Sequence, residues 1–151
     1  MKNENETTSD NAAMPYDSVL ATGLNNAATQ IHTAARNKGF WDSERETGTL
    51  LMLCVSELSE ALEADRKDRV SNLKGFNAMD WEGTDEDARE YKENYKIAFE
   101  SCIKDTFEDE LADTVIRILD LCGARGIDLE RHIDLKLKYN LTRERMHGKN
   151  Y

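Results

Sequence analysis

Helical periodicity, with no convincing alternating strand, is the feature that most constrains the fold of this 151-residue chain. Apolar residues recur at three- and four-residue intervals over long stretches, and the chain has one proline, Pro15, and eight glycines. A chain of this length forms one domain, or one domain with a large insertion. We therefore expect an all-α protein, a bundle of about four to five helices.

Capping signals locate the ends of the expected helices. Gly39 is a natural left-handed residue after the first helix, and the run Ser43-Glu44-Arg45-Glu46 has the form of a capping box for the second. Thr106 or a nearby residue begins a later helix, which ends at Gly123 or Gly126. The expected helices cover about 16–38, about 43–66, a stretch capped by Thr84 that includes 91–102, a stretch from 106 to 123 or 126, and about 128–146 capped by Asp128. We expect residues 1–14 to form a disordered tail and residues 67–83 to form a loop that packs against the helices.

Charge and cysteine usage exclude several classes of protein. The formal charge is −10 and the pI about 4.8, a field that repels nucleic-acid backbones and does not favour anionic membranes. No apolar run is long enough to cross a bilayer, and residues 1–13 are too polar for a signal peptide. Cys54, Cys102 and Cys122 lie on or beside apolar stripes, as reduced and buried thiols do. We expect a cytoplasmic protein with neither a nucleic-acid nor a membrane partner.

Two acidic motifs of similar form occur in helical surroundings, Glu57-Leu58-Ser59-Glu60 and Glu110-Leu111-Ala112-Asp113. Residues three apart share a helix face, so the two acids of each motif project together. Each pair lies beside an apolar stripe at the same angular offset, and packing the stripes together would make four carboxylates converge. The stripes are Leu51, Val55, Leu58 and Leu62 on one helix and Leu111, Val115, Ile118 and Cys122 on the other.

The converging carboxylates have more than one explanation. Acids three apart usually lie on a solvated helix face, and Arg117, one turn beyond Asp113, could form a structural ion pair with them. A hard cation accounts better for all four. The chain has no CxxC pattern and no ExxH arrangement, so oxygen-only ligands favour magnesium or manganese over zinc or iron.

The last expected helix carries a stripe of hydrogen-bond donors. Lys136, Asn140, Arg143 and His147 follow at i, i+4, i+7 and i+11, with Tyr139 adjacent. Cations near a helix C-terminus interact favourably with the helix dipole, which explains the stripe without any ligand. Beside a carboxylate-bound metal, the same stripe could instead hold a polyphosphate. The opposite, apolar side comprises Leu129, Ile133, Leu137 and Leu141.

Taken together, these motifs resemble the MazG-like nucleotide pyrophosphohydrolases of the all-α NTP pyrophosphatase superfamily. The resemblance covers most of residues 30–66 and 106–149. The segment 67–104 has no counterpart that we can place, and forms an insertion between the two acidic helices that could be a lid, a specificity element or an oligomer contact. The matching motifs are the ELSE and ELAD runs, the Thr114-Val115-Ile116-Arg117 that follows ELAD, the tail from Lys136 to Arg143 with His147-Gly148-Lys149, and the corner Lys38-Gly39-Phe40-Trp41-Asp42.

The resemblance implies a single domain over 15–151 that hydrolyses a nucleoside triphosphate at the α–β bond, giving the monophosphate and pyrophosphate. We expect a role in nucleotide-pool cleaning, and a role tied to a mobile element is the alternative. The resemblance also implies a homodimer or homotetramer that uses Mg²⁺, with Mn²⁺ as an alternative. The implied metal ligands are Glu57, Glu60, Glu110 and Asp113, with a catalytic role in orienting or deprotonating water for Glu57 or Glu60; Lys136, Tyr139, Asn140 and Arg143 are assigned to phosphates and sugar, and Trp41 to the base.

Some of these assignments have alternatives. Trp41 could equally fill a corner between helices, and His32 fits a buried polar residue better than a base reader. Two rival functions come from other classes: a non-catalytic helical oligomer with a structural cation or salt-bridge network, and an acidic interaction protein that mimics nucleic acid.

Overall fold

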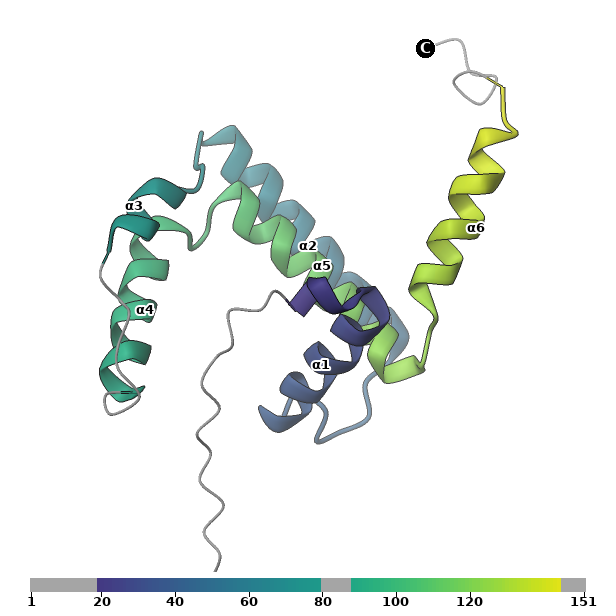
Figure 1. Cartoon of the computed structure of the whole chain (residues 1–151), viewed down its shortest axis with the longest axis horizontal. Helices are drawn as coiled ribbons and strands as arrows, with labels where there is room; N and C mark the ends of the chain where they lie inside the picture. Colours follow the sequence, from purple (N-terminus) through teal and green to yellow (C-terminus); the bar gives the residue numbers. More distant parts are fainter. Residues whose placement is uncertain (1–18, 80–87, 145–151) are drawn as a thin grey trace, which may run out of the picture.

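The computed structural model describes residues 19–79 and 88–144, and this part of the chain is helical with no strand. The predicted all-α class is confirmed. The described residues form six α-helices in place of the four to five expected, because a short one lies in a segment predicted as a loop. In chain order the elements are the 3₁₀ turn η1 (Val19–Thr22), α1 (Leu24–Asn37), α2 (Thr47–Arg66), α3 (Leu73–Ala78), α4 (Ala88–Cys102), α5 (Phe107–Arg125) and α6 (Leu129–Leu141) (Figure 1).

Helices α2 and α5 lie side by side in antiparallel directions, and α1 packs on α5 (Figure 1). Arg125 at the end of α5 donates a hydrogen bond to Thr47 at the start of α2. At the other end of the pair, the N–H of Phe107 donates to the carbonyl of Arg69 at 2.9 Å. The register of α2 against α5 is thus fixed at both ends.

Small residues form the contact between α1 and α5. Ala27 and Ala28 of α1 pack against Leu119 and Cys122 of α5. A Cβ added at Gly123 would lie 2.4 Å from the carbonyl oxygen of Ala28. Only glycine at position 123 therefore permits this close approach of the α1 and α5 backbones.

The face of α2 that meets α5 differs from the predicted one. The expectation that the two leucine-rich stripes pack together is wrong, since every stripe residue except Cys122 is 38 to 51% exposed. The small side chains of Cys54, Ala61 and Ala64 allow close approach, and they bring the face carrying Glu57 inward. The buried residues are Leu50, Cys54, Glu57, Ala61 and Ala64 of α2 and Glu110, Thr114, Leu119 and Cys122 of α5.

Four predicted helix boundaries are confirmed. Gly39 after α1 has φ +81°, and Gly126 after α5 is left-handed with φ +61°. The Thr106 hydroxyl accepts a hydrogen bond from the Asp109 N–H at 3.4 Å, and the Asp128 carboxylate accepts one from the Arg131 N–H at 3.0 Å. These caps depend on local chemistry, which the sequence specifies directly.

Other predicted boundaries are wrong. The first helix does not begin at Tyr16: Gly23, with φ +92°, separates η1 from α1. The capping box at 43–46 does not form, because α2 begins at Thr47 and its N-cap Glu46 makes no side-chain hydrogen bond. The last helix ends at Leu141 instead of 146. The predicted tail 1–14, the Thr84 cap and His147 lie outside the described residues.

The insertion forms a second, small apolar cluster. Phe76 of α3 is buried with Ala98 and Cys102 of α4, so part of the predicted loop is helical. The Asn72 N–H donates to the Cys102 carbonyl at 2.8 Å, and the Ser71 N–H donates to Glu108 of α5 at 2.9 Å. The α3–α4 unit is therefore tied to the N-terminal end of α5. None of the described helices combines the length and apolarity needed to cross a bilayer.

Candidate metal centre

Three of the four predicted ligands meet where α2 and α5 pack. Glu57, Glu60 and Glu110 each place a carboxylate oxygen within 4.8 Å of the other two. Glu57 and Glu110 are buried, whereas Glu60 is exposed. Asp113, one turn further along α5, lines the same cleft but is not part of this close group. The spacing of the acidic motifs therefore identified residues that converge, although the helices pack through a different face.

The three carboxylates fit a hard divalent cation. Ligand oxygens bound to one Mg²⁺ at about 2.0 to 2.1 Å lie roughly 3 to 4 Å apart, so small side-chain movements would close the group around an ion. The donors are all carboxylate oxygens, the ligand type that magnesium and manganese prefer.

The carboxylates of the cluster lie in an environment that disfavours their negative charge. Burial, followed by the charge of Glu60 and a hydrogen bond with Glu57, raises the pKa of Glu110 to about 7. The pKa values of Asp109 and Asp113 are also raised, first by loss of solvent and then by neighbouring carboxylates. A bound cation would relieve this repulsion.

Arg117 supplies one positive charge. Its Nε donates a hydrogen bond of 2.6 Å to a Glu57 carboxylate oxygen, and the two side chains form an ion pair. The ion pair considered above as an alternative is thus present at Glu57. Arg117 is 38% exposed at its side chain, and it balances one of the several acids around it.

A cleft of about 630 Å³ opens beside the carboxylates. One wall comes from α2 and α5. The other comes from Tyr95, Lys96 and Phe99 of helix α4 in the insertion, and from Lys104 and Asp105, which follow this helix. Tyr95 and Phe99 are four residues apart and therefore share a face of α4, but only long-range packing brings that face to the cleft with the acids. Lys96 and Asp109 were not identified from the sequence, since single charged residues on a polar helix carry no distinguishing signal.

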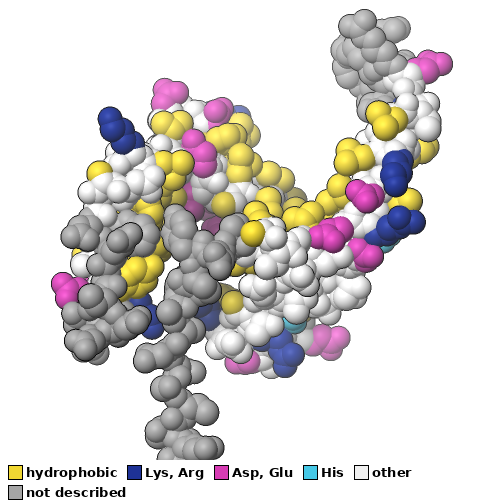
Figure 2. All heavy atoms as spheres, viewed as in Figure 1, with side chains coloured by type: hydrophobic (Ala, Val, Ile, Leu, Met, Phe, Trp, Pro, Cys, Tyr) yellow, Lys and Arg dark blue, Asp and Glu magenta, His cyan; other side chains and the backbone are white. Residues whose placement is uncertain are grey.

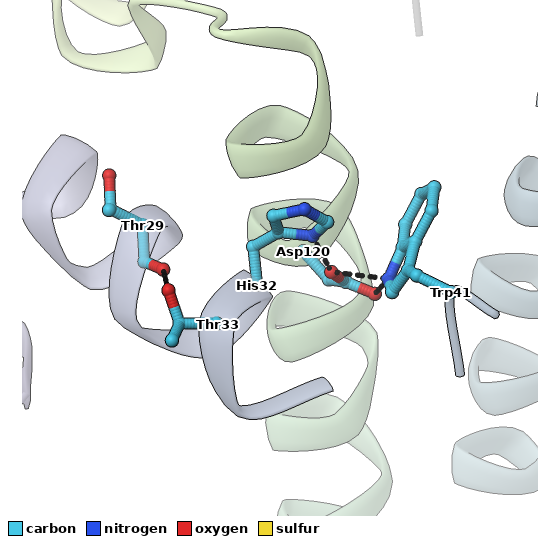
Figure 3. Close-up of polar contacts among 5 residues, drawn as sticks. All are labelled: Thr29, His32, Thr33, Trp41 and Asp120. Carbon is cyan, nitrogen blue, oxygen red and sulfur yellow. Dashed lines mark hydrogen bonds and ion pairs between the residues drawn. The ribbon is translucent and has the colours of Figure 1, made fainter. Parts of the chain in front are cut away.

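Trp41 is held in a polar cluster with His32 and Asp120 (Figure 3). Its Nε1–H donates to both oxygens of Asp120 at 3.0 Å, and His32 Nδ1 lies 2.8 Å from the same carboxylate. The His32 and Trp41 rings meet edge to face, with centroids 4.9 Å apart. Asp120 lies about 10 Å along α5 from Asp113, at the usual rise per residue. This placement favours the corner-filling role for Trp41.

The donor stripe of α6 does not reach the cleft within one chain. Helix α6 begins beyond the C-terminal end of α5, about 18 Å along that helix from Asp113, and projects away from the α2–α5 pair (Figure 1). Lys136 and Arg143 gather on the ring of Tyr139, at 5.1 and 5.9 Å from its centroid. The side-chain oxygen of Asn140 is buried without a hydrogen-bond partner in the described part of the chain.

Comparison of the chain with protein-family models, with curated proteins and with solved structures finds no match in any of the three. The resemblance to the MazG-like family therefore rests on the motifs, and the site is interpreted from its own geometry and charge.

Proposed function

We propose that this chain is a magnesium-dependent nucleoside triphosphate pyrophosphohydrolase, which uses water to split the substrate into a nucleoside monophosphate and pyrophosphate. The observation that carries the proposal is the convergence of Glu57, Glu60 and Glu110 within 4.8 Å beside a cleft of about 630 Å³. That volume suits a small-molecule ligand the size of a nucleotide.

In this proposal Glu57, Glu60 and Glu110 hold the metal, with Asp113 at the edge of the site. Bound Mg²⁺ supplies charge neutralisation at phosphate oxygens and a more acidic bound water. Among the three close carboxylates, Glu60 is the exposed one, and it accepts a hydrogen bond from Ser56 at 3.2 Å. Glu60 is thus best placed to orient the attacking water and take its proton, while the ion pair with Arg117 holds the Glu57 side chain in position.

Product identification tests the proposal. The protein is incubated with Mg²⁺ and each of a panel of nucleoside triphosphates, and the products are separated by ion-exchange chromatography. We expect monophosphate and pyrophosphate from at least one substrate, and no products in excess chelator. Orthophosphate and diphosphate as first products would refute cleavage at the α–β bond.

A second candidate is a non-catalytic helical protein with a structural ion-pair network. The Arg117–Glu57 pair favours it, because that pair neutralises a buried carboxylate without metal. It predicts no turnover of any nucleotide and no rise of the melting temperature with Mg²⁺. Among the described residues Arg117 pairs with Glu57 and no ion pair reaches Glu60 or Glu110, so an ion-pair network does not account for all three carboxylates.

We also propose a homo-oligomer, because the leucine-rich stripes of α2 and α5 lie exposed in the single chain. The assignment of Lys136, Tyr139, Asn140 and Arg143 to phosphates would then require α6 of another copy, since their own α6 leads away from the cleft. The predicted roles in the cytoplasm and in nucleotide-pool cleaning stay predictions.

A further inference from the structure

Helix α4 of the insertion lines the same cleft as the carboxylates of α2 and α5. Its helix α4 uses Ala98 and Cys102 to pack on Phe76 of α3, and this packing fixes its rotation about its own axis. The neighbouring sector of α4, with Tyr95, Phe99 and Lys96, then lines the cleft. The apolar cluster therefore determines which face of α4 lines the cleft, and the hydrogen bonds of Arg69 with Phe107 and of Ser71 with Glu108 join the insertion to α5.

The aromatic part of this wall is preorganised. The rings of Tyr95 and Phe99 stack at 6.3 Å with planes 15° apart, and Tyr95 meets Phe76 edge to face at 5.6 Å. Tyr95 thus supports Phe99 from the buried side of the cluster. Phe99 is half-buried where it borders the cleft, and an aromatic ring in that position can pack against a planar ligand.

A cation accompanies the rings. Lys96 is exposed and lines the cleft, and among the residues that the structure describes no carboxylate forms an ion pair with it. The cleft thus combines carboxylates for a metal on one wall with an aromatic ring and a lysine on the other. A molecule complementary to both walls has an anionic, metal-binding part and a flat heteroaromatic part.

We propose that α4 is the base-binding wall of the site: the nucleobase of the substrate packs against Phe99, supported by Tyr95, and Lys96 contacts the phosphates. This inference rests on the proposed function. It gives α4, which belongs to the segment without a counterpart in the MazG-like motifs, a role in substrate selection. Stacking tolerates every base, so this wall by itself selects for a base-bearing polyphosphate over inorganic polyphosphate.

The test measures binding and does not depend on turnover. Titration calorimetry with Mg²⁺ compares a nucleoside triphosphate whose α–β bridge is a non-hydrolysable methylene with inorganic tripolyphosphate, which has no base. The variants are Phe99→Leu and, as a matched control, Phe40→Leu, because Phe40 is 57% exposed between α1 and α2 and does not line the cleft. Circular dichroism and melting temperature verify that each variant is folded.

We expect Phe99→Leu to weaken binding of the nucleotide roughly 5- to 150-fold, the equivalent of about 1 to 3 kcal/mol per stacked base. Its affinity for tripolyphosphate should not change, and Phe40→Leu should match the wild type for both ligands. Lys96→Gln should weaken both ligands alike. If Phe99→Leu binds the nucleotide as the wild type does while hydrolysis by the wild type is observed, α4 is not the base-binding wall and the proposed function stands. If the wild type neither binds nor hydrolyses nucleotides, both proposals fail.

Discussion

Glu110 is the residue on which the charge balance of the cleft depends most. It is buried, it lies within 4.8 Å of two other carboxylates, and its pKa is raised to about 7. In the unfolded chain the same group has a pKa near 4.5. The folded protein therefore holds a proton on Glu110 over a pH range in which the unfolded chain has released it.

This difference predicts how stability depends on pH in the absence of metal. Between pH 4.5 and about 7 the folded state binds more protons, so the free energy of unfolding falls as the pH rises. The loss is complete above about pH 7 and amounts to at most about 3.4 kcal/mol. Urea denaturation in chelator at several pH values measures it. In Glu110→Gln the free energy of unfolding should fall less between pH 4.5 and about 7, because the titrating group is absent. The same fall in this variant as in the wild type would contradict the raised pKa.

At this scale the sequence predicted the site in part. Glu57, Glu60 and Glu110 could be found because helical spacing and a repeated motif do not depend on tertiary structure. Phe99 and Lys96 could not be assigned to the site, because their position opposite the acids depends on how α4 packs on α3.

At the scale of helices, the sequence predicted where most helices lie but not which faces meet. The caps at Thr106 and Asp128 were predictable because each involves residues only three apart. The packing of α2 on α5 was not, since hydrophobicity favoured the leucine-rich faces. Close approach through Ala61, Ala64 and Thr114 took precedence instead. The short helix α3 was missed because Gly75 and Asn77 indicate a turn.

Gly123 provides a test of the α1–α5 contact. Gly123→Ala places a Cβ 2.4 Å from the Ala28 carbonyl oxygen and 2.7 Å from His32 Cβ, so α1 must move away from α5. We expect the free energy of unfolding to fall by about 1 to 3 kcal/mol, although alanine is the better helix former. Urea denaturation measures the change.

Gly48→Ala is the matched control, since nothing lies within 4 Å of a Cβ added there in α2. This variant should be as stable as the wild type or gain up to about 1 kcal/mol. Equal stability of the two variants would show that α1 and α5 do not approach as closely as described.

At the scale of the whole molecule, apolar side chains of α2, α5 and α6 are exposed in the single chain. Seven side chains of the α2 and α5 stripes are 38 to 51% exposed, and Leu137 and Leu141 of α6 are 57% and 86% exposed. Figure 2 shows apolar side chains along α6 and over the central helices. Exposed apolar surface of this kind marks a protein–protein interaction site. A second copy of the chain is the partner that the resemblance implies.

We therefore predict a concentration-dependent dimer or tetramer in sedimentation velocity. Val115→Gln, on the exposed stripe of α5, should raise the dissociation constant about tenfold, because it puts an amide where an apolar side chain would be buried. Val70→Gln is the control, as Val70 is 66% exposed after α2 and lies outside the stripes. A monomer at all concentrations, or equal effects of the two changes, would contradict an interface on these helices.

The central claim is that the converging carboxylates form a metal site for hydrolysis, and pyrophosphate release as a function of Mg²⁺ concentration tests it most directly. Glu60→Gln removes one ligand charge with little change in shape, whereas Glu63→Gln changes an exposed glutamate one turn away that pairs with Lys67. We predict Mg²⁺-dependent release by the wild type and by Glu63→Gln. Glu60→Gln should lose at least about 100-fold in kcat/KM and require more Mg²⁺. Equal turnover and equal Mg²⁺ dependence in Glu60→Gln and Glu63→Gln would contradict the account.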